Sequence, residues 1–123
     1  HGIAPIDLLV VNLYPFEETL ARTDEAHEII ENIDIGGPAM IRAAAKNFAH
    51  VCVVVEPGDY GRVQDAIAQG GMSLALRRAL AGKAYARTSS YDTAIARYFA
   101  QTQEGGDGWP AFLLDASKAQ VLR

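Results

Sequence analysis

The chain has 123 residues, of which 50% are hydrophobic, and a formal net charge of −4 at pH 7. This length suffices for one hydrophobic core but not for two ordinary domains, and the acidic balance argues against a nucleic-acid surface, which needs clustered Lys and Arg. No apolar run approaches the ~20 residues that cross a bilayer, so we expect a soluble cytoplasmic protein with no membrane partner.

Residues 5–16, with the sequence PIDLLVVNLYPF, form an almost unbroken apolar run that ends in Asn, Tyr and Pro. Because the run lacks polar alternation, it predicts a strand covered on both faces, as in a parallel sheet between helices. Pro15 would end the strand and leave Asn12 and Tyr14 near its carboxyl end. Open α/β sheets bind ligands at this end of their strands, so both residues are candidates for a site.

The most informative segment is ENIDIGGPAMIRAAAKN, residues 31–47, which places a glycine pair at the start of a predicted helix. Gly36 and Gly37 allow a tight turn and a close approach of the backbone to a ligand, and Pro38 suits the first helical position. The free N–H groups of such a helix start can bind a phosphate, a carboxamide oxygen or a developing oxyanion.

The same helix should have one binding face and one buried face. Arg42 and Lys46 are four residues apart and project from one side, whereas the packed side would be formed by Met40, Ile41, Ala44, Ala45 and Phe48. Lys46 lies about 12 Å along the axis from Pro38, beyond the reach of its side chain. Asp34 and Lys46 can share a pocket only if residues 33–35 fold back along the helix; otherwise they serve opposite ends of a ligand.

Two shorter elements flank this segment. A helix is predicted over residues 26–31, with Thr23 or Asp24 as its cap. Residues 51–55, VCVVV, predict a second buried strand that contains the only cysteine, Cys52. We expect Cys52 to be an inert core residue, since a lone cysteine can form no intrachain disulfide and free Cys is usually buried.

The second half of the chain has a helical pattern. It predicts helices over residues 60–69 and 74–86 and a shorter helix after Ser90. Asp59 and Ser73 are the candidate caps of the first two, and the pair Gly70-Gly71 should end the first. Strands separated by helices form βαβ units, which predicts an α/β fold with a parallel sheet flanked by helices.

Three strings together indicate a family: VVNLYPF at residues 10–16, ENIDIGGPAMIRAAAKN at 31–47 and SYDTAIARYF at 90–99. In the same order, they resemble the inosine monophosphate cyclohydrolase domain of the bifunctional purine-biosynthesis enzyme that also has aminoimidazole carboxamide ribonucleotide formyltransferase activity. The resemblance implies a methylglyoxal-synthase-like α/β fold. It also implies that residues 1–123 are the C-terminal part of one cyclohydrolase domain. Residues 101–123 would then be a polar loop and a tail, with a strand if it finds a partner, leading toward the formyltransferase domain.

The implied reaction closes the six-membered purine ring: 5-formamidoimidazole-4-carboxamide ribonucleotide loses water and gives inosine monophosphate. Carried over by the resemblance, Tyr14 would hydrogen-bond the reacting oxygen or relay a proton, and Asp34 would orient or deprotonate the carboxamide. Lys46 would stabilise charge or shuttle a proton. The base would be held by Asn12 and by the backbone of Ile35, Gly36 and Gly37.

This closure needs no metal or redox cofactor, because the substrate already contains both reacting groups. Folate, as 10-formyltetrahydrofolate, would serve only the formyltransferase domain. The three histidines His1, His27 and His50 also lack the spacing of metal ligands. The family implies a purine ribonucleotide as ligand, a homodimer as assembly and phosphate-binding loops upstream of this segment, so we expect the chain alone to be inactive.

Each candidate residue also has a simpler structural interpretation. Asp34 could only cap the helix, Tyr14 could be an ordinary aromatic at a strand end, and Lys46 could be a solvated surface cation. The pair Tyr91-Asp92 could cap or staple the last helix as easily as line a site. For the whole chain, the alternative is a non-catalytic nucleotide-binding or assembly fragment of the same fold.

Overall fold

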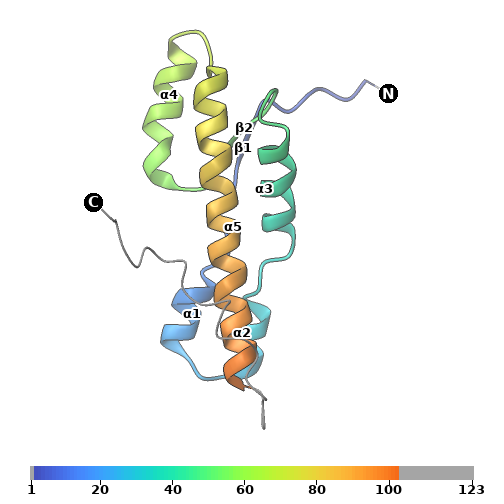
Figure 1. Cartoon of the computed structure of the whole chain (residues 1–123), viewed down its shortest axis with the longest axis vertical. Coiled ribbons are helices and arrows are strands. Elements are labelled where there is room, and N and C mark those ends of the chain that lie inside the picture. The colour runs from blue at the N-terminus through green and yellow to red at the C-terminus, as the bar shows by residue number, and fades with distance from the viewer. Residues whose placement is uncertain (1, 103–123) are drawn as a thin grey trace, which may run out of the picture.

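One long helix organises the computed structural model, which describes residues 2–102. The elements in chain order are β1 (Leu8–Val10), α1 (Phe16–Arg22), α2 (Ala26–Glu31), α3 (Gly36–Lys46), β2 (Cys52–Val54), the 3-10 turn η1 (Pro57–Asp59), α4 (Tyr60–Ala68) and α5 (Leu74–Thr102). With 29 residues, α5 is about 43 Å long. The sheet, α3 and α4 lie along its first part, and α1 and α2 lie along its last part (Figure 1).

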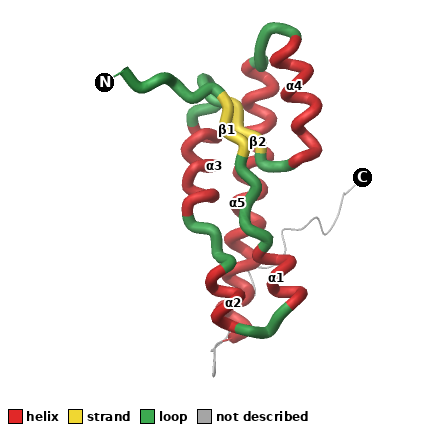
Figure 2. The backbone as a smooth tube through the Cα atoms, turned by 180° about the vertical axis from the view of Figure 1, so that it is seen from behind, coloured by secondary structure: helices red, strands yellow, loops and turns green. Residues whose placement is uncertain are grey.

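The sheet consists of β1 and β2, which pair in parallel with Leu8 opposite Cys52 and Val10 opposite Val54. The chain crosses between them through α1, α2 and α3, as the view from behind shows (Figure 2). The pairing extends one residue further, where the Val11 N–H donates to the Val54 carbonyl at 3.0 Å. The predicted α/β class, with a parallel sheet flanked by helices, is confirmed.

Strand β2 is covered on both faces, as its sequence predicts. Its buried segment alternates between two apolar clusters: Val51, Val53 and Val55 pack with residues of α3 and α5, whereas Cys52 and Val54 pack with residues of α4 and α5. The same prediction is wrong for β1, because Val10 is 48% exposed. Within residues 2–102, β1 pairs only with β2, so one edge of β1 stays open.

The predicted strand over residues 5–16 is much shorter in the structure, and a helix that the sequence analysis missed follows it. Helix α1 begins at Phe16, whose ring is fully buried. Pro15 ends the extended segment as expected, but its carbonyl then accepts hydrogen bonds from the N–H and hydroxyl groups of Thr19, at 2.9 and 3.0 Å. These bonds start a helix one residue after the proline.

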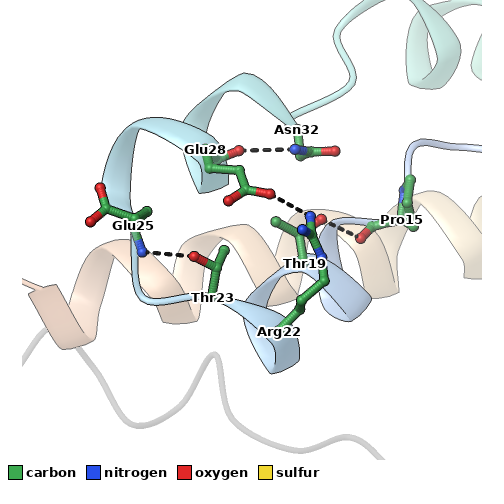
Figure 3. A network of polar contacts seen from close by, with 7 residues as sticks. All are labelled: Pro15, Thr19, Arg22, Thr23, Glu25, Glu28 and Asn32. Carbon is green, nitrogen blue, oxygen red and sulfur yellow. Dashed lines mark hydrogen bonds and ion pairs between the residues drawn. The ribbon is translucent and has the colours of Figure 1, made fainter.

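Polar contacts hold the turn between α1 and α2 (Figure 3). Arg22 and Glu28 form an ion pair across the two helices, and the side chain of Asn32 donates to the Glu28 carbonyl at 2.9 Å. Neither predicted cap is correct, because the helix is preceded directly by Glu25. Thr23 instead stabilises the turn by accepting the Glu25 N–H at 3.2 Å.

The two helices predicted over residues 74–86 and after Ser90 are one continuous helix, α5. The hydroxyl-rich stretch between them does not break it, because these side chains bond to the preceding turn. Thr88 donates to the Tyr85 carbonyl at 3.1 Å, and Thr93 donates to the Ser89 carbonyl at 2.8 Å. The helix runs to Thr102, so residues 101–102 are helical rather than loop, and the rest of the predicted loop and tail lies outside the described residues.

The ends of α4 and the start of α5 follow the sequence more closely. Gly70 and Gly71 end α4 with positive φ angles of 108° and 133°, and Ser73 Oγ caps α5 by accepting the Leu76 N–H at 3.1 Å. Asp59 precedes α4 as predicted but does not cap it; its carboxylate accepts a hydrogen bond from Lys83 at 2.7 Å. In the part of the chain that the structure describes, none of the helices is both long and apolar enough to cross a membrane.

Candidate functional site

The carboxyl end of β1 and the start of α3 are joined through Asp34. Its Oδ1 accepts the backbone N–H of Gly37 at 2.7 Å, and its Oδ2 accepts the backbone N–H of Tyr14 at 3.3 Å. Two segments that lie twenty residues apart therefore meet at the edge of the sheet where the sequence placed the site. The bond to Gly37 agrees with the capping interpretation of Asp34, whereas the bond to Tyr14 joins a second segment to it. Each carboxylate oxygen keeps a further lone pair for a ligand.

The occupied N–H of Gly37 restricts what the helix start can bind. Gly37 is buried, and the Asp34 carboxylate already lies at the position where an anion would bind a helix N-terminus. A phosphate at this point would meet a like charge and lose the N–H donor. Of the three ligands that the sequence allows there, a neutral carboxamide is favoured over a phosphate.

The side chains of β1 and of the extended segment after it alternate between the core and the solvent. Leu9, Val11 and Leu13 pack against the core, so successive side chains point to opposite faces. The intervening residues Val10, Asn12 and Tyr14 are exposed. Asn12 and Tyr14 thus share the outward face, next to Asp34.

Asn12 contacts Tyr60, a residue that the sequence analysis did not select. The Asn12 amide donates to the Tyr60 hydroxyl at 3.1 Å. Tyr60 also lines an open apolar groove of about 270 Å³, together with Leu8, Val10, Val54, Val63, Gln64 and Ile67. No motif marks Tyr60, because its partner lies 48 residues earlier in the chain.

Lys46 lies at the opposite end of α3 from Asp34. It lies ten positions after Gly36 on the helix, about 15 Å along the axis, and it is exposed. Because Asp34 bonds to the start of α3, residues 33–35 do not fold back along the helix. Of the two arrangements that the sequence left open, the shared pocket formed by folding back does not occur in the structure.

The faces of α3 are mostly as predicted. Ile41, Ala44 and Ala45 are buried, but Met40 is 49% exposed, so its predicted packing role is wrong. Arg42 is exposed and stacks 5.6 Å above the ring of Tyr85 on α5. It lines an open cavity of about 490 Å³ with Tyr85, Thr88, Ser89, Asp92, Thr93 and Ala96.

Tyr91 reaches the site from α5, which the sequence could not show. It is completely buried, and its hydroxyl accepts the backbone N–H of Asp34 at 2.9 Å and donates to the Asn32 carbonyl at 3.2 Å. Burial raises the pKa of Tyr91 above its ordinary value, which favours the neutral hydroxyl that donates to Asn32. Its neighbour Asp92 points to the other cavity instead.

The groups that could bind a metal or act as a thiol nucleophile are scattered or buried in the part of the chain that the structure describes. Within residues 2–102, no three His, Cys, Asp or Glu side chains gather closely enough to hold a metal ion. Cys52 is fully buried, and burial raises the pKa of its thiol. This agrees with its predicted role as a core residue.

Several longer proteins are similar to this chain. The protein named bifunctional purine biosynthesis protein PurH of Bradyrhizobium diazoefficiens is 63% identical over 101 residues, which cover 80% of this chain and 19% of that protein. The protein of the same name of Chelativorans sp. is 54% identical over 126 residues, covering 100% of this chain and 23% of that protein. The chain thus spans about one fifth of the curated relatives it matches.

A solved structure and a family model agree with these relatives. The crystal structure of ForH superposes with a TM-score of 0.67 at 37% identity, covering 80% of this chain and 53% of that one. The sequence model of the AICARFT/IMPCHase bienzyme family matches residues 44–123, more than half of the chain. The chain belongs to the AICARFT/IMPCHase bienzyme family.

Proposed function

We propose that this chain contributes to an inosine monophosphate cyclohydrolase site in purine biosynthesis, as part of a bifunctional formyltransferase and cyclohydrolase. Membership of the family and the purine-biosynthesis names of the relatives support this reaction. The observation that carries the proposal is the bridge of the Asp34 carboxylate between the N–H groups of Tyr14 and Gly37. It brings the Asp34 carboxylate, the backbone of Tyr14 and the start of α3 together at one edge of the sheet.

The proposed reaction is intramolecular. The carboxamide nitrogen attacks the formyl carbon and charge develops on the formyl oxygen. This oxygen leaves as water, with one proton from the carboxamide nitrogen and one from the formamido nitrogen. Asp34 would orient or deprotonate the weakly nucleophilic carboxamide, and the Tyr14 hydroxyl would donate to the developing oxyanion. Holding both reacting groups in line supplies much of the rate, without a metal or redox cofactor.

The other proposed contacts to the ligand lie at two separate places. Asn12 and the exposed backbone of Ile35 and Gly36 would hold the base next to Asp34. Lys46 would act at the other end of α3, by stabilising charge or passing a proton. The family resemblance further implies a homodimer.

The replacement of Asp34 by Asn tests this proposal in the full-length protein that carries the chain. Asn keeps the size of the side chain and an oxygen for the Gly37 N–H, but it cannot take a proton. We expect Asp34→Asn to slow ring closure by about 10²-fold or more, while formyl transfer by the other domain is unchanged. The matched control is Asp65→Asn on the exposed surface of α4, which should leave both rates at the wild-type value.

Wild-type ring closure by Asp34→Asn would contradict the proposal and favour a non-catalytic nucleotide-binding role. A second measurement uses the chain alone. Tyr14 is 57% exposed and Ile35 is 78% exposed, so the site is open to water that would compete for its polar groups. We therefore expect residues 1–123 by themselves to form no useful inosine monophosphate.

A further inference from the structure

Tyr91 lies far from the Asn12–Gly37 region in the sequence, yet its side chain bonds to the backbone around Asp34. Its ring is fully buried between α1 and α2, where it meets the edge of the Phe16 ring with centroids 6.1 Å apart. Its hydroxyl is both an acceptor and a donor of hydrogen bonds to one short loop. It accepts the Asp34 N–H at 2.9 Å and donates to the Asn32 carbonyl at 3.2 Å.

The loop to which Tyr91 bonds contains Asp34 itself. Asn32 follows the end of α2, and α3 begins at Gly36, so Asp34 lies between two helices rather than within either. Its carboxylate then reaches the N–H groups of Gly37 and Tyr14. A shift of the Asp34 backbone would therefore move the carboxylate relative to the Tyr14 side chain.

A second residue on the same side of α5 connects Tyr91 to the segment that carries Tyr14. Arg87 is one helical turn earlier, and its guanidinium lies 5.7 Å from the centre of the Tyr91 ring. It also pairs with Glu17 of α1 at 2.9 Å. Because α1 begins two residues after Tyr14, α5 holds both sides of the site.

We propose that Tyr91 is a positioning residue, whose hydroxyl fixes the Asn32–Asp34 loop so that the Asp34 carboxylate faces the reacting carboxamide. This inference rests on the proposed function. The ring supplies packing, and the hydroxyl supplies the alignment. Removal of the hydroxyl leaves the Asp34 N–H and the Asn32 carbonyl without this partner, and the loop can then rotate to find water.

The test is Tyr91→Phe in the full-length protein, which removes one oxygen and keeps the ring. We expect kcat for ring closure to fall about 10- to 100-fold, the size of effect that a small misplacement produces, with KM and formyl transfer little changed. The control is Tyr98→Phe, because Tyr98 packs on the same Phe16 ring at 6.2 Å. In the described part of the chain, the bonds to the Asn32–Asp34 loop come from the hydroxyl of Tyr91 and not from that of Tyr98, so this variant should match the wild type.

A double-mutant cycle with Asp34→Asn shows whether Tyr91 acts through Asp34. The inference predicts that Tyr91→Phe slows the wild type but has no further effect on Asp34→Asn. Equal effects in both backgrounds, or wild-type kcat in Tyr91→Phe, would overturn it while the proposed function stands. If the single variant Asp34→Asn keeps the wild-type turnover, the proposed function itself is wrong, and this inference is wrong with it.

Discussion

The carboxylate of Asp34 occupies the space beside Gly37 that the side chain of any other residue would enter. A Cβ atom on Gly37 would lie 2.5 Å from Asp34 Oδ2 and 2.8 Å from its Cγ. The same carboxylate accepts the Gly37 N–H at 2.7 Å. Glycine is needed at this position because of this close approach, whereas a Cβ on the adjacent Gly36 would meet nothing within 4 Å.

We therefore expect Gly37→Ala to destabilise the domain. The added methyl group must displace the carboxylate and disrupt its bond to the helix start, and overpacking of this kind costs about 1–3 kcal/mol. Gly82→Ala is the matched control, because it lies exposed within α5 and its Cβ would meet nothing within 4 Å. This change should stabilise by about 0.5–1 kcal/mol through the better helix propensity of Ala. The urea midpoints of unfolding of both variants and the wild type provide the measurement, and a Gly37→Ala midpoint at or above that of the wild type would contradict this account.

Lys46→Ala should slow ring closure by about 10²-fold with little effect on ligand binding, as expected for the loss of acid–base or electrostatic help. Lys46 and Asp34 lie at opposite ends of α3. The rate losses of Lys46→Ala and Asp34→Asn should therefore multiply in the variant that carries both changes. Arg62→Ala, at an exposed cation of α4, serves as the control and should keep the wild-type rate. Steady-state kinetics of the four variants check this, and wild-type turnover by Lys46→Ala would remove Lys46 from the mechanism.

The sequence predicted mainly the elements that depend on short-range patterns. The glycine pair and the periodicity of residues 36–46 predicted α3, and the apolar string around Cys52 predicted β2. Helix α1 was missed because its start depends on Pro15 accepting bonds from Thr19. The continuity of α5 was missed because hydroxyl side chains usually favour caps and turns but here bond to the preceding turn.

The contacts that shape the candidate site are long-range, and for that reason the sequence could not predict them. Tyr91 reaches the Asp34 backbone across 57 residues, and Tyr60 reaches Asn12 across 48. Asp59 stands at a helix start, as a cap would, but its carboxylate is bound by Lys83 from α5. The positions of Tyr14, Asp34 and Gly37 could be predicted to converge because they share one edge of the sheet.

The ion pair of Glu17 and Arg87 should make stability depend on pH. Partial burial of Glu17 alone would raise its pKa. The hydrogen bond from Arg87, a backbone hydrogen bond of Glu17 and the charge of Arg87 together outweigh burial and hold the pKa below the ordinary value of 4.5. A pKa lowered by folding stabilises the folded state above pH 4.5, and this contribution disappears as the pH falls through the folded pKa.

Glu17→Gln should therefore lower the unfolding free energy near neutral pH, with the difference from wild type shrinking toward zero below pH 4.5. Urea unfolding at a series of pH values measures this difference. Glu18→Gln, the exposed neighbour in the same first turn of α1, controls for the helix dipole. A Glu17→Gln difference that stays constant from neutral to acidic pH would show that the pair does not contribute in this way.

A crystal structure of the full-length protein with inosine monophosphate bound tests the central claim most directly. The account predicts that the six-membered ring lies over Ile35, Gly36 and Gly37, within contact of Tyr14 and Asp34. The ribose phosphate should point away from the start of α3, because the Asp34 carboxylate already takes the Gly37 N–H. A phosphate bound at the Gly37-Pro38 helix start, or a nucleotide bound only in the cavity beside Arg42 and Tyr85, would contradict the account.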